Sequence, residues 1–459
     1  MGMFRLAEAA TVPGIVHRGP DLAVTGVTTD SRSIGRGDLF VALNGERFDG
    51  HDFVDQALAA GAAAALVSDA GKVKTTAAAL LVAQDTRLAL GALAQWWRGR
   101  FTIPIAGVTG SNGKTTVKEM LAAILRADAG DAAVLATAGN LNNDIGVPLM
   151  LFRLRETHRY AVIEMGMNHL GEIAYLTRLT RPSVAAINNA GSAHIGELGS
   201  HDNIARAKGE IFEGLPVEGI KVINADDRYA QFWRGLAPGH RTIDFALDHE
   251  AAVTGTYELT ADGSLVTIET PLGSAVARIQ VPGVHNVRNA LCAAAAAHAL
   301  GIAPVTIGVG LSAYRGTTGR LQRNVGVNGA TIIDDTYNAN PDSMQAAIAW
   351  LAGLPGKRIF VMGDMGELGD EAAARHAEIG ESARERGIDA LFAMGDASAG
   401  AAKAFGKGAR HFGDLDQLVA AVSEASNAST TVLVKGSRFM RMERVVARLA
   451  PNAATVGDH

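Results

Sequence analysis

The chain has 459 residues, of which 48% are hydrophobic and 19% charged, with a formal net charge of −5. This length predicts about two to four domains, because a single hydrophobic core stops growing beyond roughly 250–300 residues. The acidic balance and the absence of a Lys/Arg-rich run argue against nucleic acid as a partner. No apolar run reaches the ~18 residues that a membrane span needs.

The single cysteine, Cys292, lies in an Ala-rich run and has no partner for an internal disulfide. Such a residue is typical of a protein from a reducing compartment. The N-terminal MGMFRLAEAATVPG lacks the apolar region of a secretion signal. We therefore expect a cytoplasmic protein, and we expect it to be a monomer.

The first unit, residues 1–84, is predicted to be a small α/β domain. DLFVAL, Asp38–Leu43, is predicted to be a strand. FVDQALAAG is predicted to be a helix that ends at Gly61, and AAAALVS the strand after it. No phosphate-binding glycine loop occurs in this unit.

The second unit, residues 85–315, alternates apolar strands with helical patterns, which predicts a mostly parallel sheet with helices on both faces. DTRLALGALAQWWRGR is predicted to be a helix with Asp85 as its N-cap. Buried strands are predicted at IPIAGV, YAVIEMG, SVAAINNA and KVINAD. The run Val253–Val281 alternates apolar and polar residues, as antiparallel strands do, and HNVRNALCAAAAAHALG is predicted to be a long closing helix.

The third unit, residues 316–459, contains apolar strands that each end at Gly, Asp or Ser, with helical sequence between them. This pattern predicts a doubly wound, Rossmann-like α/β domain. Its glycines do not form the GxGxxG fingerprint of a dinucleotide site. The final segment, Pro451–His459, is predicted to be a frayed tail.

The stretch IAGVTGSNGKTTVKEML, Ile105–Leu121, places a Gly-rich turn between a strand and a helix. Backbone N–H groups and the helix dipole make such a turn an anion site. Lys114 supplies a charge for the β- and γ-phosphates and Thr115 a hydroxyl for Mg²⁺. Val108 stands where the strict phosphate-loop pattern has its first glycine. The stretch nevertheless predicts an ATP or GTP site formed by Gly107, Val108, Thr109, Gly110, Ser111, Asn112, Gly113, Lys114, Thr115 and Thr116.

Three further side chains are candidates for chemistry at the phosphates. Glu164 ends a predicted strand, and the carboxyl ends of strands face the ligand crevice of an α/β sheet. Because phosphoryl transfer needs a metal to neutralise the phosphate charges, Glu164 is a candidate metal ligand. His194 follows the next buried strand, where structural and ligand roles are both open. Lys208 lies on a predicted helix, where a lysine is usually solvated.

These segments, in their order, resemble the Mur ligase family, whose members add amino acids to the peptide of the cell-wall precursor. The resemblance covers essentially the whole chain, and the form GxxGxxGKTT is the family's own. It rests on GVTGSNGKTT, GNLNNDIGVPL, VIEMGMNHLGEI, AGSAHIGELGS, ARAKGEIF, HNVRNALCA, Gly319-Arg320 and DDTYNANPDSM. YNANPDSM, GDMGELG, KGSRFMRMERV and TDSR resemble the members that add D-alanyl-D-alanine. The DNPR sequence of the diamino-acid-adding members is absent.

The resemblance implies roles for individual residues. The catalytic set is Lys114, Glu164, His194 and Lys208, and the metal ligands are Thr115, Glu164, His194 and, if carbamylated, Lys208. Further nucleotide contacts are implied for Asn286, Asn289, Arg320 and Asp335. Substrate contacts are implied for Thr29, Asp30, Ser31, Arg32, Asn142, Asn143, Tyr337, Asn338 and Asn340. The chain departs from many relatives at Gly196 and Leu198, where they have an acidic and an aromatic residue.

The implied activity is ATP- and Mg²⁺-dependent amide formation in peptidoglycan precursor synthesis. An acyl phosphate forms on UDP-N-acetylmuramoyl-tripeptide and reacts with the amine of D-alanyl-D-alanine. We expect the first unit to hold the UDP end, the second ATP, and the third the dipeptide, with closure of the third unit excluding water. Alternatives are a sibling Mur or folylpolyglutamate-type ligase, a P-loop ATPase switch or motor, and a non-catalytic nucleotide-binding module.

Overall fold

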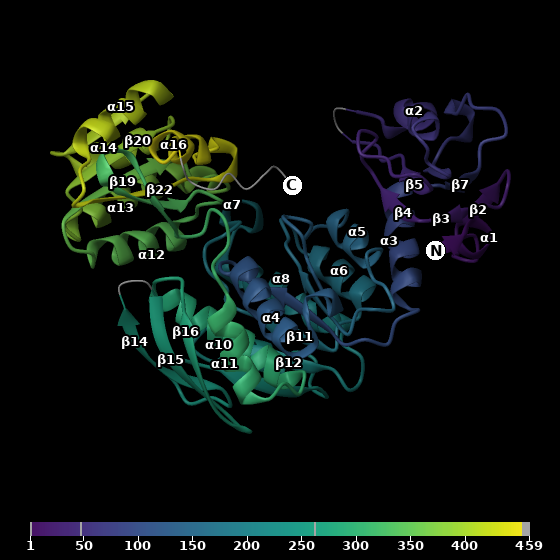
Figure 1. The fold of residues 1–459 in the computed structure, drawn as a ribbon, viewed down its shortest axis with the longest axis horizontal. Helices are drawn as coiled ribbons and strands as arrows, with labels where there is room; N and C mark the ends of the chain where they lie inside the picture. Colours follow the sequence, from purple (N-terminus) through teal and green to yellow (C-terminus); the bar gives the residue numbers. More distant parts are fainter. Residues whose placement is uncertain (1, 46–47, 261–262, 452–459) are drawn as a thin grey trace.

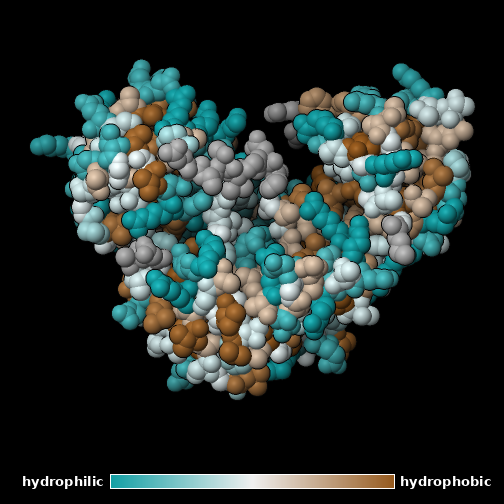
Figure 2. Space-filling view, in the orientation of Figure 1, coloured by the Kyte–Doolittle hydropathy of each residue, from teal (hydrophilic) through white to brown (hydrophobic). Residues whose placement is uncertain are grey.

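The structure, a computed structural model, describes residues 2–45, 48–260 and 263–451. It confirms three α/β units, which form a V with the central unit at its base and the other two as its arms (Figure 1). A hollow lies open between the arms (Figure 2). The predicted frayed tail lies outside the described residues from position 452 onward. No helix in the described ranges is both long and apolar enough to cross a membrane.

The N-terminal unit is a small α/β layer of short elements. They are β1 (Phe4–Arg5), α1 (Leu6–Ala9), β2 (Ile15–Arg18), β3 (Ala23–Val24), β4 (Gly26–Thr28), β5 (Asp38–Val41), α2 (Val54–Ala59), β6 (Ala64–Val67) and β7 (Leu80–Ala83). Its sheet has the order β2-β7-β6-β5-β4, in which only β2 is antiparallel to its neighbour. The strand predicted to end at Leu43 ends at Val41.

The central unit is built on a six-stranded parallel sheet. Its strands are β8 (Ile105–Thr109), β9 (Val134–Ala136), β10 (Tyr160–Glu164), β11 (Val184–Ile187), β12 (Ile220–Asn224) and β13 (Arg241–Phe245). Their order is β13-β12-β11-β8-β10-β9, and every neighbouring pair is parallel. The strands read as apolar runs because helices cover the sheet on both faces.

One face of this sheet packs against α5 (Gly146–Leu151), α6 (Glu172–Thr180) and α8 (His201–Gly209). The other face packs against α4 (Lys114–Ala129) and α10 (Val284–Ala299). The predicted antiparallel run forms a three-stranded sheet beside α10. The remaining elements are α3 (Thr86–Arg98), α7 (Ile195–Leu198), α9 (Ala230–Gly235), β14 (Thr254–Thr260), β15 (Gly263–Thr270), β16 (Gly273–Ile279) and α11 (Pro304–Ala313).

The third unit has a six-stranded sheet between two layers of helices. Its strands are β17 (Gln322–Val325), β18 (Thr331–Asp335), β19 (Lys357–Gly363), β20 (Ala390–Met394), β21 (Ala409–Phe412) and β22 (Thr430–Lys435). Their order is β17-β18-β22-β19-β20-β21, and only β17 is antiparallel to its neighbour. One face carries α12 (Pro341–Ala352), α13 (Ala372–Glu385) and α14 (Ser398–Phe405), and the other α15 (Leu415–Ala425) and α16 (Glu443–Leu449). The predicted doubly wound arrangement is confirmed.

The first two units share one continuous hydrophobic core, whereas the third has cores of its own. An aromatic seam, formed by Phe4, Trp96, Trp97 and Phe152, joins the first two units at α3. The ring centroid of Phe4 lies 5.4 Å from Trp96, 5.9 Å from Trp97 and 6.4 Å from Phe152. Aromatic pairs at these separations add stabilisation beyond the area they bury.

Helix α3 begins as predicted, because a carboxylate oxygen of Asp85 accepts hydrogen bonds from the N–H groups of Arg87 (2.8 Å) and Leu88 (3.0 Å). Asp85→Ala removes this cap and is expected to cost about 1 kcal/mol of stability. The midpoint of thermal unfolding of the first two units, followed by circular dichroism, should fall by about 1–2 °C. Asp85→Asn keeps an accepting oxygen and should lose much less. Equal losses in the two variants would assign the effect to the charge instead of the cap.

Candidate active site

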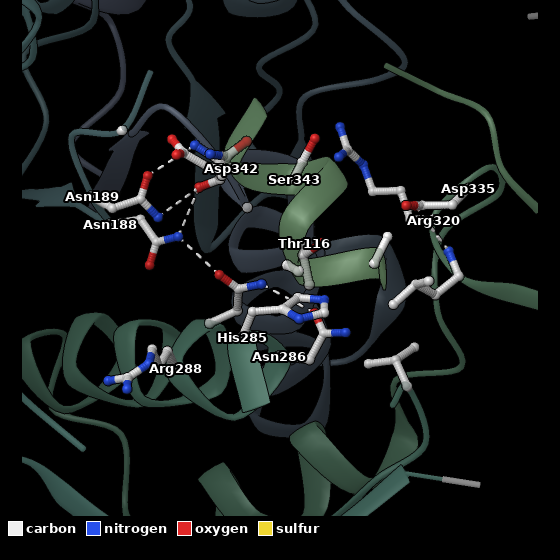
Figure 3. A pocket seen from close by; sticks show the side chains of 18 of the residues that line it. Thr116, Asn188, Asn189, His285, Asn286, Arg288, Arg320, Asp335, Asp342 and Ser343 are labelled. Carbon is white, nitrogen blue, oxygen red and sulfur yellow. Dashed lines mark hydrogen bonds between the residues drawn. The ribbon is translucent and has the colours of Figure 1, made fainter. Parts of the chain in front are cut away.

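A cavity of about 460 Å³ lies between the central and third units (Figure 3). It sits at the carboxyl ends of parallel strands from both units, where open α/β sheets bind their ligands. Several predicted nucleotide-binding residues line it: Asn112, Gly113, Thr116, Asn286, Asn289, Arg320 and Asp335.

The glycine loop, residues 110–113, joins β8 to α4 and is held by asparagines. Gly113 has a φ of +78°, and a Cβ there would lie 2.2 Å from Oδ1 of Asn289 and 2.6 Å from Nδ2 of Asn188. The N–H of Asn112 donates to Oδ1 of Asn189 over 2.9 Å. The loop therefore requires glycine at position 113 both for its backbone conformation and for this close approach.

The amine of Lys114 folds back over the glycine loop. Its Nζ donates to the backbone carbonyls of Gly110 (2.6 Å) and Ser111 (3.2 Å). Burial lowers the pKa of Lys114, and the carboxylate of Glu164 opposes this shift. A phosphate anion beside the amine would also favour its charged form.

Glu164 and Lys208 each present a buried atom without a hydrogen-bond partner among the described residues. Oε1 of Glu164 accepts from Nδ2 of Asn142 over 2.8 Å, whereas Oε2 has no partner. Nζ of Lys208 is fully buried and also has none. Burial lowers the pKa of Lys208 well below its usual range, the charge of Lys114 adds to the shift, and Glu210 and Glu164 oppose it. Buried polar atoms of this kind usually have partners, so these two indicate a bound group.

His194 begins the short helix α7 in a left-handed conformation. Its Nδ1 lies 2.8 Å from Oε2 of Glu367, which belongs to the third unit. The contact with His194 lowers the pKa of Glu367, burial opposes the shift, and the charges of His194 and Lys114 add to it. The carboxylate of Glu367 therefore interacts electrostatically with His194 and Lys114 at the phosphate end of the site.

Other polar contacts join the third unit to the glycine loop and its surroundings. Nη2 of Arg320 donates to Oγ1 of Thr115 over 3.3 Å, and Nδ2 of Asn340 donates to Oδ1 of Asn112 over 2.8 Å. The carboxylate of Asp342 accepts from the N–H of Ser192 over 2.6 Å. These side chains close the cavity from the side of the third unit.

Three family profiles match the chain in order: "Mur ligase family, catalytic domain" over residues 23–98, "Mur ligase middle domain" over residues 108–297, and "Mur ligase, glutamate ligase domain" over residues 319–438. The chain is also 44% identical over 440 residues to the UDP-N-acetylmuramoyl-tripeptide--D-alanyl-D-alanine ligase of Escherichia coli (strain K12). That match covers 95% of this chain and 96% of the relative. The chain belongs to the Mur ligase family.

Solved Mur ligases have the same fold. MurF from Acinetobacter baumannii superposes with a TM-score of 0.91 at 37% identity, covering 97% of this chain and 99% of that one. MurF ligase from Thermotoga maritima, solved in complex with ADP, superposes with a TM-score of 0.82 at 27% identity, covering 92% and 96%. The resemblance recognised in the sequence motifs is therefore confirmed.

In this Mur ligase, not every residue predicted for the nucleotide site reaches the cavity. Gly107, Val108 and Thr109 lie within β8, buried between β10 and β11. The hydroxyl of Thr109 donates to the carbonyl of Met165. These three residues form the end of the strand that leads into the glycine loop, and their burial in the sheet fixes the position of the loop.

The residues predicted to bind substrate lie in separate places. Thr29, Asp30, Ser31 and Arg32 follow β4 in the N-terminal unit, which is the arm of the V opposite the third unit (Figure 1). There the guanidinium of Arg32 pairs with Asp30 and lowers the pKa of that carboxyl to about 2.

Asn142 and Asn143 lie just before α5. The side-chain amide of Asn142 donates to Glu164. Oδ1 of Asn143 accepts from the N–H groups of Gly146 (2.8 Å) and Ile145 (3.3 Å). In this structure the two asparagines therefore support the metal candidate and the start of a helix.

Tyr337, Asn338 and Asn340 lie in the segment that joins β18 to α12 of the third unit. The ring centroid of Tyr337 is 4.4 Å from Cζ of Arg320, and the carbonyl of Asn338 accepts from Nζ of Lys435. Because Asn340 contacts Asn112, this segment reaches the nucleotide side of the cavity.

The sequence reasoning missed several lining residues: Asn188, Asn189, Asn224, Asp227, His285, Arg288, Tyr314, Asp342, Ser343 and Lys435. Asn188 and Asn224 stand at the carboxyl ends of β11 and β12. The strand-end argument that selected Glu164 applies to them equally and would have found them.

Proposed function

We propose that this chain is an ATP-dependent ligase that joins D-alanyl-D-alanine to UDP-N-acetylmuramoyl-tripeptide, a step of peptidoglycan precursor synthesis. The observation that carries the proposal is the convergence of Lys114, Glu164 and Lys208, whose charges act on one another. They lie at the glycine loop, whose Asn112 and Gly113 line the cavity between the central and third units. The similarity to the Escherichia coli ligase extends over almost the whole of both chains and supports the same substrates.

We further propose that the three units divide the ligands. Residues 1–84 would bind the UDP end, residues 85–315 ATP, and residues 316–459 the incoming dipeptide. The three matched family profiles fall one in each region, apart from the first extending to residue 98. The separation of the N-terminal and third units by the hollow gives room for a long precursor between them (Figure 2).

Mg²⁺ fits the donor set at the phosphate end. Thr115, Glu164 and His194 would hold it, and the free oxygen of Glu164 is a ligand type that Mg²⁺ prefers. The bound ion would neutralise charge on the phosphates during transfer. Burial lowers the pKa of Lys208 well below its usual range and so favours the uncharged amine, which is the form that reacts with CO₂. The resulting carbamate would contribute to a second metal site.

The proposed reaction begins when the terminal carboxylate of the tripeptide attacks the γ-phosphorus of ATP, so that ADP leaves and an acyl phosphate forms. Lys114 and the N–H groups of the glycine loop position the phosphates, and Arg320 adds positive charge from the third unit. The amine of D-alanyl-D-alanine then attacks the acyl carbon, and phosphate leaves. Closure of the third unit would keep water from the acyl phosphate.

A phosphate-release assay tests the proposed substrates. With ATP, Mg²⁺ and UDP-N-acetylmuramoyl-tripeptide, D-alanyl-D-alanine should stimulate phosphate release and give a product with the mass of the joined peptide. Release that needs no acceptor would favour the ATPase switch or motor. Stimulation only by a diamino acid with the dipeptide precursor, or by glutamate with a folate, would favour the sibling ligases.

Gly113→Ala tests the nucleotide site. The new Cβ would meet Asn289 and Asn188, and the left-handed backbone costs alanine about 1–3 kcal/mol. ADP binding, measured by calorimetry, should weaken about tenfold or more. Gly171→Ala is the matched control, because Gly171 caps the start of α6 in the same left-handed conformation (φ +87°) with no atom within 4 Å of its Cβ position. Equal effects of the two variants would contradict a local role for the loop.

Carbamylation of Lys208 is testable by carbon NMR. Incubation with ¹³C-bicarbonate should give a carbamate signal that is missing from Lys208→Gln. Lys221→Gln, the control, should keep the signal, since Lys221 is equally buried but its Nζ donates to the carbonyls of Arg234 and Leu236. A signal that persists in Lys208→Gln would contradict the assignment.

A further inference from the structure

We propose that Glu367 is a positioning residue that orients His194 only when the third unit is docked on the central unit. This inference rests on the proposed function, because it takes His194 to be a metal ligand. Glu367 lies in the run GDMGELG, which the proposed function leaves without a role. The proposal makes docking of the third unit a condition for a complete phosphate site.

The first observation is the contact itself. Nδ1 of His194 lies 2.8 Å from Oε2 of Glu367 across the interface. The distance is that of an ion pair, although Nδ1 has no aligned hydrogen-bond partner among the described residues. A carboxylate at this place favours the proton on Nδ1, which leaves Nε2 as the nitrogen for a cation. Histidines that bind metals usually have their second nitrogen held in this way, which fixes both the tautomer and the ring orientation.

The second observation is how closely the backbones of the two loops approach. The N–H of Gly196 donates to the carbonyl of Glu367 over 3.0 Å. A Cβ on Gly196 would lie 2.8 Å from that carbonyl oxygen and 2.9 Å from the nitrogen of Gly369. This approach explains why glycine stands at position 196, where many relatives are expected to have an acidic residue.

The third observation is that both partners have unusual backbone conformations. His194 has a φ of +65° and Glu367 a φ of +63°. Residues other than glycine adopt such angles at a cost of about 1–3 kcal/mol and keep them only where the surroundings fix them. The two strained residues face each other across the same interface.

The fourth observation is that the Glu367 loop is fixed to its own unit. The N–H of Met365 donates to Nε2 of His376 over 2.9 Å, and that of Gly366 to Oγ of Ser437 over 2.8 Å. On the central unit, Ile195, the residue after His194, packs against the core of its own unit and against a core of the third unit. Glu367 must therefore move with the third unit, and its distance from His194 depends on docking.

Glu367 could instead bind a cation directly. Ligand atoms of His194, Glu197 and Glu367 lie within 4.8 Å of one another. Direct ligation would make the negative charge of Glu367 necessary, whereas positioning needs only the oxygen that lies beside Nδ1 of His194. The positioning role is the one we infer, because the oxygen of Glu367 already lies 2.8 Å from Nδ1 of His194.

The test compares Glu367→Ala, Glu367→Gln and Gly196→Ala with Glu381→Ala, which removes an exposed carboxylate on α13 of the same unit. Mn²⁺ binding is measured by electron paramagnetic resonance with a non-hydrolysable ATP analogue, and kcat and KM are measured separately. Glu367→Ala should raise the Mn²⁺ dissociation constant and lower kcat by roughly 10–100-fold, with little change in the KM for ATP. Glu381→Ala should match the wild type.

The other two variants separate positioning from ligation. Glu367→Gln should recover most of the loss, because its amide oxygen still accepts from Nδ1. Gly196→Ala should lose Mn²⁺ affinity although it removes no candidate ligand, since its Cβ holds the loops apart. In the background of His194→Ala, removal of the Glu367 carboxylate should have no further effect.

Wild-type Mn²⁺ affinity in Glu367→Ala would overturn the proposal. So would a loss in Glu367→Gln as large as in Glu367→Ala, which would indicate direct ligation. The binding measurements need no peptide acceptor. If they give the expected pattern while the wild type forms no amide, the proposed function fails and the positioning role stands.

Discussion

The geometry of the site depends on one constraint, the shape of the turn between β8 and α4. The turn is fixed from below by a strand buried in the middle of a parallel sheet and from the sides by Asn188, Asn189 and Asn289. Its N–H groups can surround a phosphate only while position 113 has no side chain. The neighbouring strands then bring Glu164 and the His194 loop to the same edge of the sheet.

The two interfaces of the molecule differ in chemistry. The N-terminal and central units meet through a continuous apolar core and the aromatic seam. The third unit meets the central unit largely through polar pairs, such as Asn340 with Asn112 and Asp342 with Ser192. Polar pairs exchange readily with water, whereas separation of an apolar core exposes a large hydrophobic area. Motion is therefore expected at the second interface.

Local motifs and residues at the ends of strands could be predicted from the sequence. The phosphate loop was predictable because its strand, glycines and helix lie within Ile105–Leu121. The position of Glu164 at the same sheet edge as the glycine loop was predictable, because carboxyl ends of parallel strands share one edge of the sheet. The alternation of apolar strands and helices likewise predicted the main sheet of each of the three units. The individual roles of the site residues remain proposals that rest on family resemblance.

Contacts between units could not be predicted in the same way. Asn340 and Asn112, or Glu367 and His194, are far apart in the chain, and no periodic pattern connects them. Their pairing depends on how two separately folded units dock. A motif such as GDMGELG could therefore be recognised without any indication of which side chain it would meet.

The aromatic seam has a consequence for the length of the peptide stem that the site can accept. Because Phe4 and Trp97 pack the first unit against the second, an apolar core sets the spacing between the TDSR turn and the glycine loop. A ligand anchored at its UDP end would present its far carboxyl to the phosphates only if its peptide had the right number of residues. In the proposed function, the two units that share this core would thus set the stem length, while the third unit would select the amine that is added.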